Sequence, residues 1–537
     1  MDRFIPGRAG VSFAASLARR PDRVARRAVG LAGGLARAAA GTGEGAPRGD
    51  RRFVDPAWSD NPVFSRLVQG YLAAGRTLDG VLEDAKLDVQ DERRVRFALE
   101  NLHDAAAPSN YLLTNPVALR TTVQERGANL VRGARAFASD MASSPRLPSS
   151  VDADAFDVGV DVAATPGSVV MRTELFELIQ YAPQTGMVRA EPVLFVPPMV
   201  NKYYLVDLAP ERSLVEALVR AGQQVFALSW RNPTAEQRDW TLDTYAGGVL
   251  EAVETITAIT GSDRFHLAGN CSGGALVSAL AARMAVRGEL DRLGSIMLGV
   301  CVIDSERAGT ASAFMGPEVA KLAVEAVDRR GYLDGEALQS FFAWLRPNDL
   351  IWHYVQNNYL LGRTPPAFDI LFWNAHTTRM AAGLLRDLAD LALSNALAKP
   401  DAMELLGTPI DLGAVTTDAY VVAGVSDHIT PWENCYATTQ LLGGDTRFVL
   451  SRSGHVAALV NPPGNPKARY RVADDGVNPP AAEEWLDGAS ERSGTWWTDW
   501  AAWLGERSGD LRRAPKRAGN RRHPALGPAP GTYVLED

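Results

Sequence analysis

One cysteine lies in a run of small residues that could make it a nucleophile. Cys271 is the centre of GNCSGG at 269–274, which follows the apolar run at 265–268 and precedes an apolar, helix-like stretch. A strand, a sharp turn and a helix in this order form a nucleophile elbow, where large side chains beside the nucleophile would collide with the neighbouring strand and helix. The alternative is a small buried residue at a strand end, because cysteine is commonly buried. The elbow interpretation predicts a nucleophilic Cys271, with Gly269 and Gly273 keeping the turn compact.

Two later residues would complete a Cys-His-Asp triad. When the nucleophile comes from an elbow of this type, an acid and then a histidine should follow, each just beyond a later strand. Asp427 follows a strand-like run in AYVVAGVSDHI, and His455 follows the next one in RFVLSRSGH. We therefore predict a triad of Cys271, His455 and Asp427. His428 is a possible auxiliary that could tune Asp427, although adjacent residues on an extended segment point in opposite directions.

Acyl transfer at such a nucleophile also needs amides that bind a developing oxyanion. One is expected from Ser272, the residue after the nucleophile, and another from the loop after an early strand. The early strand at 192–196 runs into Pro197 and Pro198, which have no N–H to donate. The backbone amides of Met199 and Val200 are therefore the predicted second donors.

The elements around these residues predict an α/β fold with a mostly parallel sheet. Short apolar runs alternate with helix-like stretches beyond about residue 150, which is typical of such sheets. The segment at about 305–410 has more than a hundred residues, is rich in Trp, Phe, Tyr and Leu, and shows no clear succession of strand-like runs. An insertion of this length predicts a cap. We predict an α/β-hydrolase fold with a cap (lid) insertion, preceded by a helical N-terminal domain. The strand-like runs are 192–196, 225–230, 265–268, 295–302, 419–423 and 447–450.

Composition shifts suggest the domain boundaries. Residues 1–52 are rich in Arg, Ala and Gly and are predicted to be a flexible or partly helical tail; the alternative is an arginine-bearing amphipathic segment for an apolar or lipid surface. Residues 53–150 show helical periodicity, and a Ser-Pro-Asp stretch separates them from a catalytic domain at 151–537. An aromatic and then basic segment ends that domain at about 495–537.

Overall composition excludes several classes of protein. The chain has 537 residues, a net charge of -8 and only three cysteines. A disulfide framework is excluded, and the acidic balance argues against a nucleic-acid partner. We find no apolar run long enough for a transmembrane segment and no spacing typical of a metal site, so we expect neither.

Several longer motifs resemble those of polyhydroxyalkanoate synthases, over nearly the whole chain from Phe53. The C-terminal TWWTDWAAWLGERSG and PALGPAPGTYV are most similar to the branch that acts on medium-chain monomers. The other motifs are FVDPAWSDNP at 53, PSNYLLTNP at 108, PPMVNKYYLVDL at 197, SWRNP at 229, GNCSGG at 269, NNYLLGRTPPAFDILFWN at 357, GVSDHITPW at 424 and SGHVAALVNPPGNPKARY at 453.

The resemblance implies polymerisation of (R)-3-hydroxyacyl-CoA into a polyester with release of CoA. It implies that Cys271 carries the growing acyl chain, that His455 is the general base and that Asp427 orients or assists His455. No cofactor is implied, because CoA is part of the substrate and a product. The resemblance also implies a homodimer at the surface of polyester granules in the cytoplasm. Two residues depart from the family pattern: His376 stands where Asp is usual, and Ala381 stands where Pro is usual.

Two other functions remain open. A cysteine-dependent hydrolase of thioesters, lactones or polyesters would use the same triad with water as acceptor, but it would not need the helical N-terminal region or the aromatic C-terminal segment. A non-catalytic scaffold protein of the granule would not need an intact triad.

Overall fold

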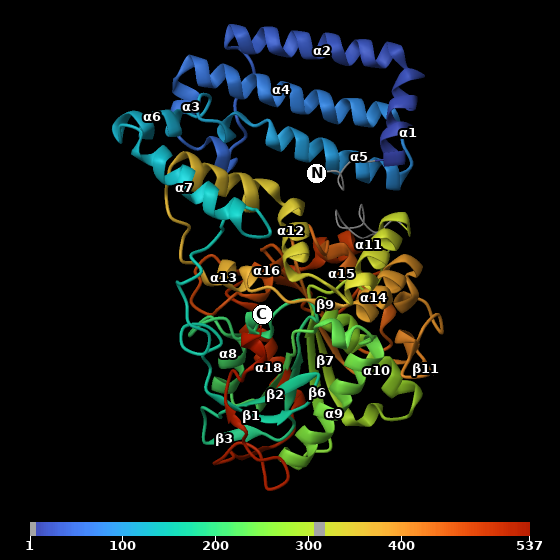
Figure 1. Cartoon of the computed structure of the whole chain (residues 1–537). Coiled ribbons are helices and arrows are strands. Elements are labelled where there is room, and N and C mark those ends of the chain that lie inside the picture. The colour runs from blue at the N-terminus through green and yellow to red at the C-terminus, as the bar shows by residue number, and fades with distance from the viewer. Residues whose placement is uncertain (1–6, 306–316, 537) are drawn as a thin grey trace. The chain divides into compact units, whose positions relative to one another are not determined.

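The computed structural model describes residues 7–305 and 317–536, and these form two compact units (Figure 1). The first unit contains residues 7–152 and 336–367. The second contains residues 153–305, 317–335 and 368–536.

Helices make up the first unit. Helix α4 begins where the sequence supplies both a cap and a proline, because the Asn61 side chain accepts a hydrogen bond from the Val63 amide and Pro62 takes the first helical position. Helix α2 lies along α4, and small residues at Gly34 and Ala73 allow the close approach. The helices are α1 (Gly7–Ala18), α2 (Pro21–Ala40), α3 (Ala57–Asp60), α4 (Pro62–Ala85), α5 (Val89–Ala105), α6 (Pro116–Gln124), α7 (Ala128–Ala142) and α12 (Gly335–Leu345), followed by π-helical turns at Asn348–Trp352 and Val355–Leu360.

The described part of the tail predicted at 1–52 is mostly helical rather than flexible. Helices α1 and α2 occupy most of it, and arginines of α2 are fixed by a carboxylate of α4. Arg23 and Arg27 each pair with Asp84, at 3.0 Å and 2.8 Å. Alanine and arginine both favour helix, so the composition that suggested a tail is also that of a good helix former.

An eleven-stranded sheet forms the centre of the second unit. Its order is β15-β14-β13-β12-β7-β6-β4-β5-β2-β1-β17, and the six strands from β13 to β5 are parallel. The remaining strands pair antiparallel at both ends of the sheet. The strands are β1 (Gly167–Arg172), β2 (Phe176–Tyr181), β4 (Val193–Val196), β5 (Val225–Trp230), β6 (Phe265–Asn270), β7 (Leu293–Gly299), β12 (Ala419–Gly424), β13 (Thr446–Ser451), β14 (Arg469–Val472), β15 (Ser490–Ser493) and β17 (Gly527–Pro528).

Helices cover both faces of this sheet. Helices α8 and α18 share one hydrophobic core with strand residues such as Val193, Phe195 and Val422, and α9 and α10 lie on the other face (Figure 1). The helices are α8 (Leu214–Arg220), α9 (Leu242–Thr260), α10 (Ser272–Val286), α11 (Pro317–Arg330), α13 (Asp369–Ala375), α14 (Ala382–Ser394), α15 (Trp432–Leu441), α16 (His455–Leu459), α17 (Ala482–Gly488) and α18 (Trp496–Arg507). Short strand pairs join β3 (Met187–Arg189) to β16 (Leu511–Arg513), β8 (Tyr332–Leu333) to β9 (Met380–Ala381), and β10 (Glu404–Leu405) to β11 (Thr408–Pro409).

All six strand-like runs correspond to strands of the parallel part, so this region of the α/β-hydrolase fold is as predicted. The antiparallel strands at the sheet's ends were not predicted, because their residues are not continuous apolar runs. The predicted cap at about 305–410 is divided in the structure: residues 336–367 belong to the helical unit, and 317–335 and 368–410 to the unit with the sheet. Residues 306–316 lie outside the described residues.

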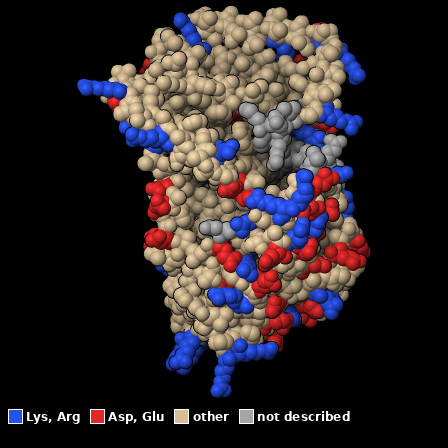
Figure 2. Space-filling model, in the orientation of Figure 1, with Lys and Arg blue, Asp and Glu red and all other residues tan. Residues whose placement is uncertain are grey.

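The surface of the second unit carries both signs of charge. Figure 2 shows acidic and basic side chains interspersed on one face, the usual character of a solvated surface. Within residues 7–305 and 317–536, no helix is long and apolar enough to cross a membrane.

Limited trypsin digestion tests whether α2 is an ordered helix. Arg23 and Arg27 should resist cleavage in the native protein, because their ion pairs with Asp84 hold helix α2 against α4. The Asp84→Asn variant removes both ion pairs and should be cleaved faster at these arginines, as followed by mass spectrometry of the fragments. Glu83→Gln is the matched control, because Glu83 is mostly exposed and reaches Arg27 only at 3.8 Å. Immediate cleavage of the unmodified protein at both arginines would contradict an ordered α2.

Candidate active site

Cys271 occupies the sharp turn between β6 and α10. Its backbone has φ 51° and ψ -126°, a conformation that costs a residue with a side chain about 1–3 kcal/mol. Two backbone hydrogen bonds hold the turn: the Cys271 amide donates to the Gly299 carbonyl at 2.9 Å, and the Cys271 carbonyl accepts from the Gly274 amide at 3.0 Å. The cysteine is therefore kept at the end of a buried strand, and its side chain remains partly exposed.

The two glycines of the elbow have no room for a side chain. A Cβ at Gly269 would lie 2.5 Å from the Gly273 carbonyl oxygen, and a Cβ at Gly273 would lie 2.3 Å from the Val196 carbonyl oxygen. Helix α10 can therefore approach both β6 and the end of β4. The second contact also fixes the distance between the elbow and the loop that leaves β4.

Asp427 and His455 meet beyond the ends of β12 and β13. His455 Nδ1 lies 2.7 Å from Asp427 Oδ2, and the carboxylate is fully buried while the imidazole is 15% exposed. Asp427 is held in turn by residues that follow it: its Oδ1 accepts from the amides of Ile429 and Thr430, each at 2.9 Å, and its Oδ2 accepts from the Thr430 hydroxyl at 2.6 Å. The carboxylate thus has a fixed orientation toward the ring.

The pair favours a protonated imidazole. Burial opposes the charged ring, but hydrogen bonds with Asp427 and with Cys271 outweigh it and raise the pKa of His455 to about 10. Burial likewise opposes the charged Asp427, but the hydrogen bond and charge of His455, together with hydrogen bonds from Thr430, outweigh it, so the pKa of Asp427 is lowered. The ring nitrogen bonded to Asp427 therefore acts as the donor, and the other nitrogen is the one available for the sulfur.

Helix α18 supports the short helix that carries His455. The indole N–H groups of Trp496 and Trp497 donate to the carbonyls of Ala458 and Leu459, at 2.7 Å and 2.9 Å. Both tryptophans are buried, and the two carbonyls belong to the last turn of α16, beyond the helix's own amides; the Asn461 amide also donates to the Leu459 carbonyl, at 3.2 Å. Sequence reasoning noted the aromatic segment but missed this function. Thr430 was also missed, although a threonine three residues after an aspartate is a common turn arrangement.

The predicted oxyanion residues lie around the elbow, on two different segments. Ser272 begins α10, and Met199 and Val200 are in the loop after β4. Met199 is buried, and the Pro197 carbonyl of the same loop accepts a hydrogen bond from the Trp230 indole at 3.0 Å. The roles of their amides stay predictions.

Other residues near the site are less suited to chemistry. His428 is half-buried beside Asp427, and its auxiliary role stays a prediction. Cys301 and Cys435 are fully buried, and burial raises the pKa of each thiol above its usual range. Among the three cysteines, Cys271 is the one placed at a strained turn with a partly exposed side chain.

The fold and the order of these residues define the class of the protein. A nucleophile turn after β6, an acid after β12 and a histidine after β13 are the features of the α/β-hydrolase fold. A family model of the α/β hydrolase fold matches residues 192–293, and a model described as poly-beta-hydroxybutyrate polymerase (PhaC) N-terminus matches residues 49–218.

Curated relatives identify the family. The chain is 45% identical over 487 residues to poly(3-hydroxyalkanoate) polymerase 1 of Ectopseudomonas oleovorans, covering 91% of this chain and 86% of the relative. It is 44% identical over 518 residues to polymerase 2 of the same organism, covering 96% and 92%. It is 39% identical over 495 residues to the polymerase subunit PhaC of Cupriavidus necator, covering 91% and 83%. The chain belongs to the poly(3-hydroxyalkanoate) polymerase family.

Replacing Gly273 by alanine tests the packing of the elbow. The new Cβ would overlap the Val196 carbonyl, so the free energy of unfolding should fall by about 1–3 kcal/mol. Gly247→Ala is the matched control, because a Cβ at this position in α9 meets nothing within 4 Å and alanine favours helix. Chemical denaturation would measure both variants. Equal stability of the Gly273→Ala variant and the unmodified protein would contradict the close contact.

Titration by NMR tests the charge state of His455. In protein labelled at histidine, the resonance lost in His455→Gln should titrate near pH 10, and it should titrate lower in Asp427→Asn, which loses the principal partner. Because the folded pKa lies above the ordinary 6.5, the stability that this proton contributes is complete below about pH 6.5. It should decrease as the pH rises and be lost above about pH 10. An ordinary midpoint near 6.5 would contradict the coupled pair.

Proposed function

We propose that this protein polymerises (R)-3-hydroxyacyl-CoA through a thioester on Cys271. The observation that carries the proposal is a cysteine at the elbow of an α/β-hydrolase fold, together with the imidazole and carboxylate of His455 and Asp427. Family membership supports the same reaction, because the relatives are poly(3-hydroxyalkanoate) polymerases.

The first step transfers the acyl group from CoA to the enzyme. His455 takes the thiol proton, the Cys271 sulfur attacks the thioester carbonyl, and the C–S bond to CoA breaks as the proton passes to the departing CoA sulfur. Amides of Ser272 and of Met199 or Val200 would stabilise the negative oxygen of the tetrahedral intermediate. Asp427 keeps the ring oriented and stabilises its positive charge.

The second step forms the polyester bond. The 3-hydroxyl of another acyl group attacks the Cys271 thioester, His455 takes the hydroxyl proton, and the proton returns to the sulfur as the ester forms. Cysteine suits this sequence because exchanging one thioester for another loses little free energy, so the acyl group remains activated for the hydroxyl. A serine ester would be less activated.

Water must be kept from the thioester for polymerisation to succeed over hydrolysis. We also propose, as implied by the family resemblance, that the enzyme is a homodimer, acts at the surface of polyester granules in the cytoplasm and prefers medium-chain monomers. The reaction itself needs no bound cofactor beyond the CoA of the substrate.

The test incubates purified protein with (R)-3-hydroxyacyl-CoA of short and of medium chain length, following free CoA and polymer together. CoA release with polymer is expected, and Cys271→Ala should lower the rate by about a thousandfold or more, because the nucleophile and base act as a unit. Cys301→Ala is the matched control, because it removes a buried thiol outside the triad. CoA release that yields only free hydroxy acid would overturn the polymerase proposal in favour of a thioester hydrolase. No loss in Cys271→Ala would overturn the role of this cysteine.

A further inference from the structure

The C-terminal segment 526–536 runs across the end of the sheet and returns toward the loop after β4. It begins by pairing with β1: the Leu526 amide donates to the Val169 carbonyl at 2.7 Å, and the Ala529 amide donates to the Gly167 carbonyl at 3.0 Å. It ends in a single 3-10 turn, Tyr533–Leu535. We call residues 526–536 the C-terminal strap.

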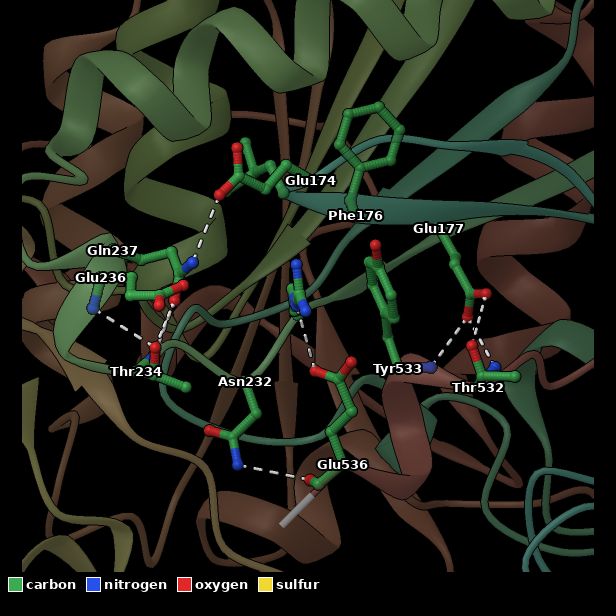
Figure 3. Close-up of polar contacts among 12 residues, drawn as sticks. Glu174, Phe176, Glu177, Asn232, Thr234, Glu236, Gln237, Thr532, Tyr533 and Glu536 are labelled. Atoms are coloured by element: carbon green, nitrogen blue, oxygen red, sulfur yellow. Dashed lines mark hydrogen bonds and ion pairs between the residues drawn. The ribbon is translucent and has the colours of Figure 1, made fainter.

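A buried carboxylate on β2 binds the strap. Glu177 is fully buried, and its Oε2 accepts hydrogen bonds from the amides of Thr532 and Tyr533, at 2.8 Å and 3.0 Å (Figure 3). Its Oε1 accepts from the Thr532 hydroxyl at 3.1 Å and from Arg172 Nε at 2.7 Å. Hydrogen bonds to a charged acceptor are stronger than neutral ones, so Glu177 is the principal polar contact of the strap.

The approach of the strap to Glu177 depends on glycine. Gly531 has φ +82°, and a Cβ there would lie 2.2 Å from Glu177 Oε2. Just beyond it, Val534 is fully buried in the core under the sheet, and the Tyr533 hydroxyl donates to the Thr173 carbonyl at 2.6 Å. The strap is thus attached by both polar and apolar contacts.

Glu536, the last described residue of the strap, contacts residues that follow β4 and β5. The Glu536 carbonyl accepts a hydrogen bond from Asn232 Nδ2 at 3.3 Å (Figure 3). It also accepts one from the Lys202 ammonium. Its side chain pairs with Arg231 at 3.5 Å. Lys202 is only 4% exposed and Asn232 is likewise buried, so neither can easily replace this acceptor with bulk water.

Lys202 ends the loop that carries the predicted oxyanion amides. The Lys202 carbonyl accepts from the Trp373 indole at 2.8 Å, and Asn201 pairs with Thr377 through a β-bridge. At the other end of the loop, the backbone at Pro197 lies against Gly273 of the elbow. Contacts therefore run from the strap through Lys202 to the loop at 197–202, and from that loop to the turn beside Cys271.

We propose that the C-terminal strap is a positioning element for the loop at 197–202, acting through Lys202 and secured by Glu177. Its effect on catalysis rests on the proposed function, because it acts by holding Met199 and Val200 where an oxyanion forms. Its effect on the order of the loop does not depend on that function.

Amide hydrogen exchange tests, without substrate, whether the strap orders the loop at 197–202. Glu177→Gln keeps the shape of the side chain but removes its charge, and the NH2 group that replaces Oε1 cannot accept from Arg172 or the Thr532 hydroxyl, so the strap should exchange faster. The proposal expects that peptides covering 197–205 also exchange at least about tenfold faster. Glu174→Gln is the matched control: this carboxylate lies three residues away, contacts Gln237 and is not in contact with the strap in Figure 3.

The kinetics of CoA release test whether the strap affects catalysis. Glu177→Gln should lower kcat by about tenfold with KM within twofold, because small displacements of an oxyanion donor raise the barrier more than they weaken binding. Across the variants, faster amide exchange of the loop should accompany a lower kcat. A strap that exchanges freely while the loop and kcat keep their wild-type values would overturn the proposal.

A second variant keeps the test valid if Glu177→Gln does not fold. Gly531→Ala pushes the strap from Glu177 while leaving the carboxylate intact, and Gly527→Ala is its control, because a Cβ there meets nothing within 4 Å. The same coupled change in loop exchange and kcat is expected for Gly531→Ala alone. If the unmodified protein released no CoA, the proposed function would fail, while the exchange experiment would still decide whether the strap orders the loop.

Discussion

The contact between the elbow and the end of β4 is the constraint on which the site depends. Because Gly273 has no side chain, α10 can press its first turn against the Val196 carbonyl. That contact fixes Cys271 relative to the loop at 197–202, and it leaves the cysteine in a backbone conformation that a relaxed chain would avoid. The parallel strands on either side of β6 offset this cost, because β4 is fully buried and β7 is buried at all but one residue.

A separate set of contacts holds His455 and Asp427. Thr430 and two amides fix the Asp427 carboxylate, and the indoles of Trp496 and Trp497 fix the helix that begins with His455. Both supports are buried, so the geometry is in place before a substrate arrives. The aromatic segment near the C-terminus therefore helps to position the site. In the same way, the C-terminal strap positions the loop after β4.

The sequence was sufficient for the residues that follow strict rules of chain order. The placement of Cys271, Asp427 and His455 after successive parallel strands could be predicted because each follows an apolar run typical of a buried strand, while their catalytic roles stay predictions. Strands β1 and β2 could not, because residues such as Glu177 and Gln180 break the apolar pattern while being buried by contacts distant in sequence. The helices at 7–40 could be predicted only in part, because their contacts with Asp84 join residues more than forty positions apart. Lys202 and Glu536 meet only through folding, so no local pattern could connect them.

The central claim is that Cys271 carries the acyl chain as a thioester. The most direct measurement is mass spectrometry of the protein after brief exposure to an acyl-CoA that lacks the 3-hydroxyl group, followed by digestion to locate the added mass. The account predicts one acyl group per chain on the peptide that contains Cys271, released by hydroxylamine and absent in Cys271→Ala. An acyl group found on another residue, or none under conditions in which CoA is released, would contradict it.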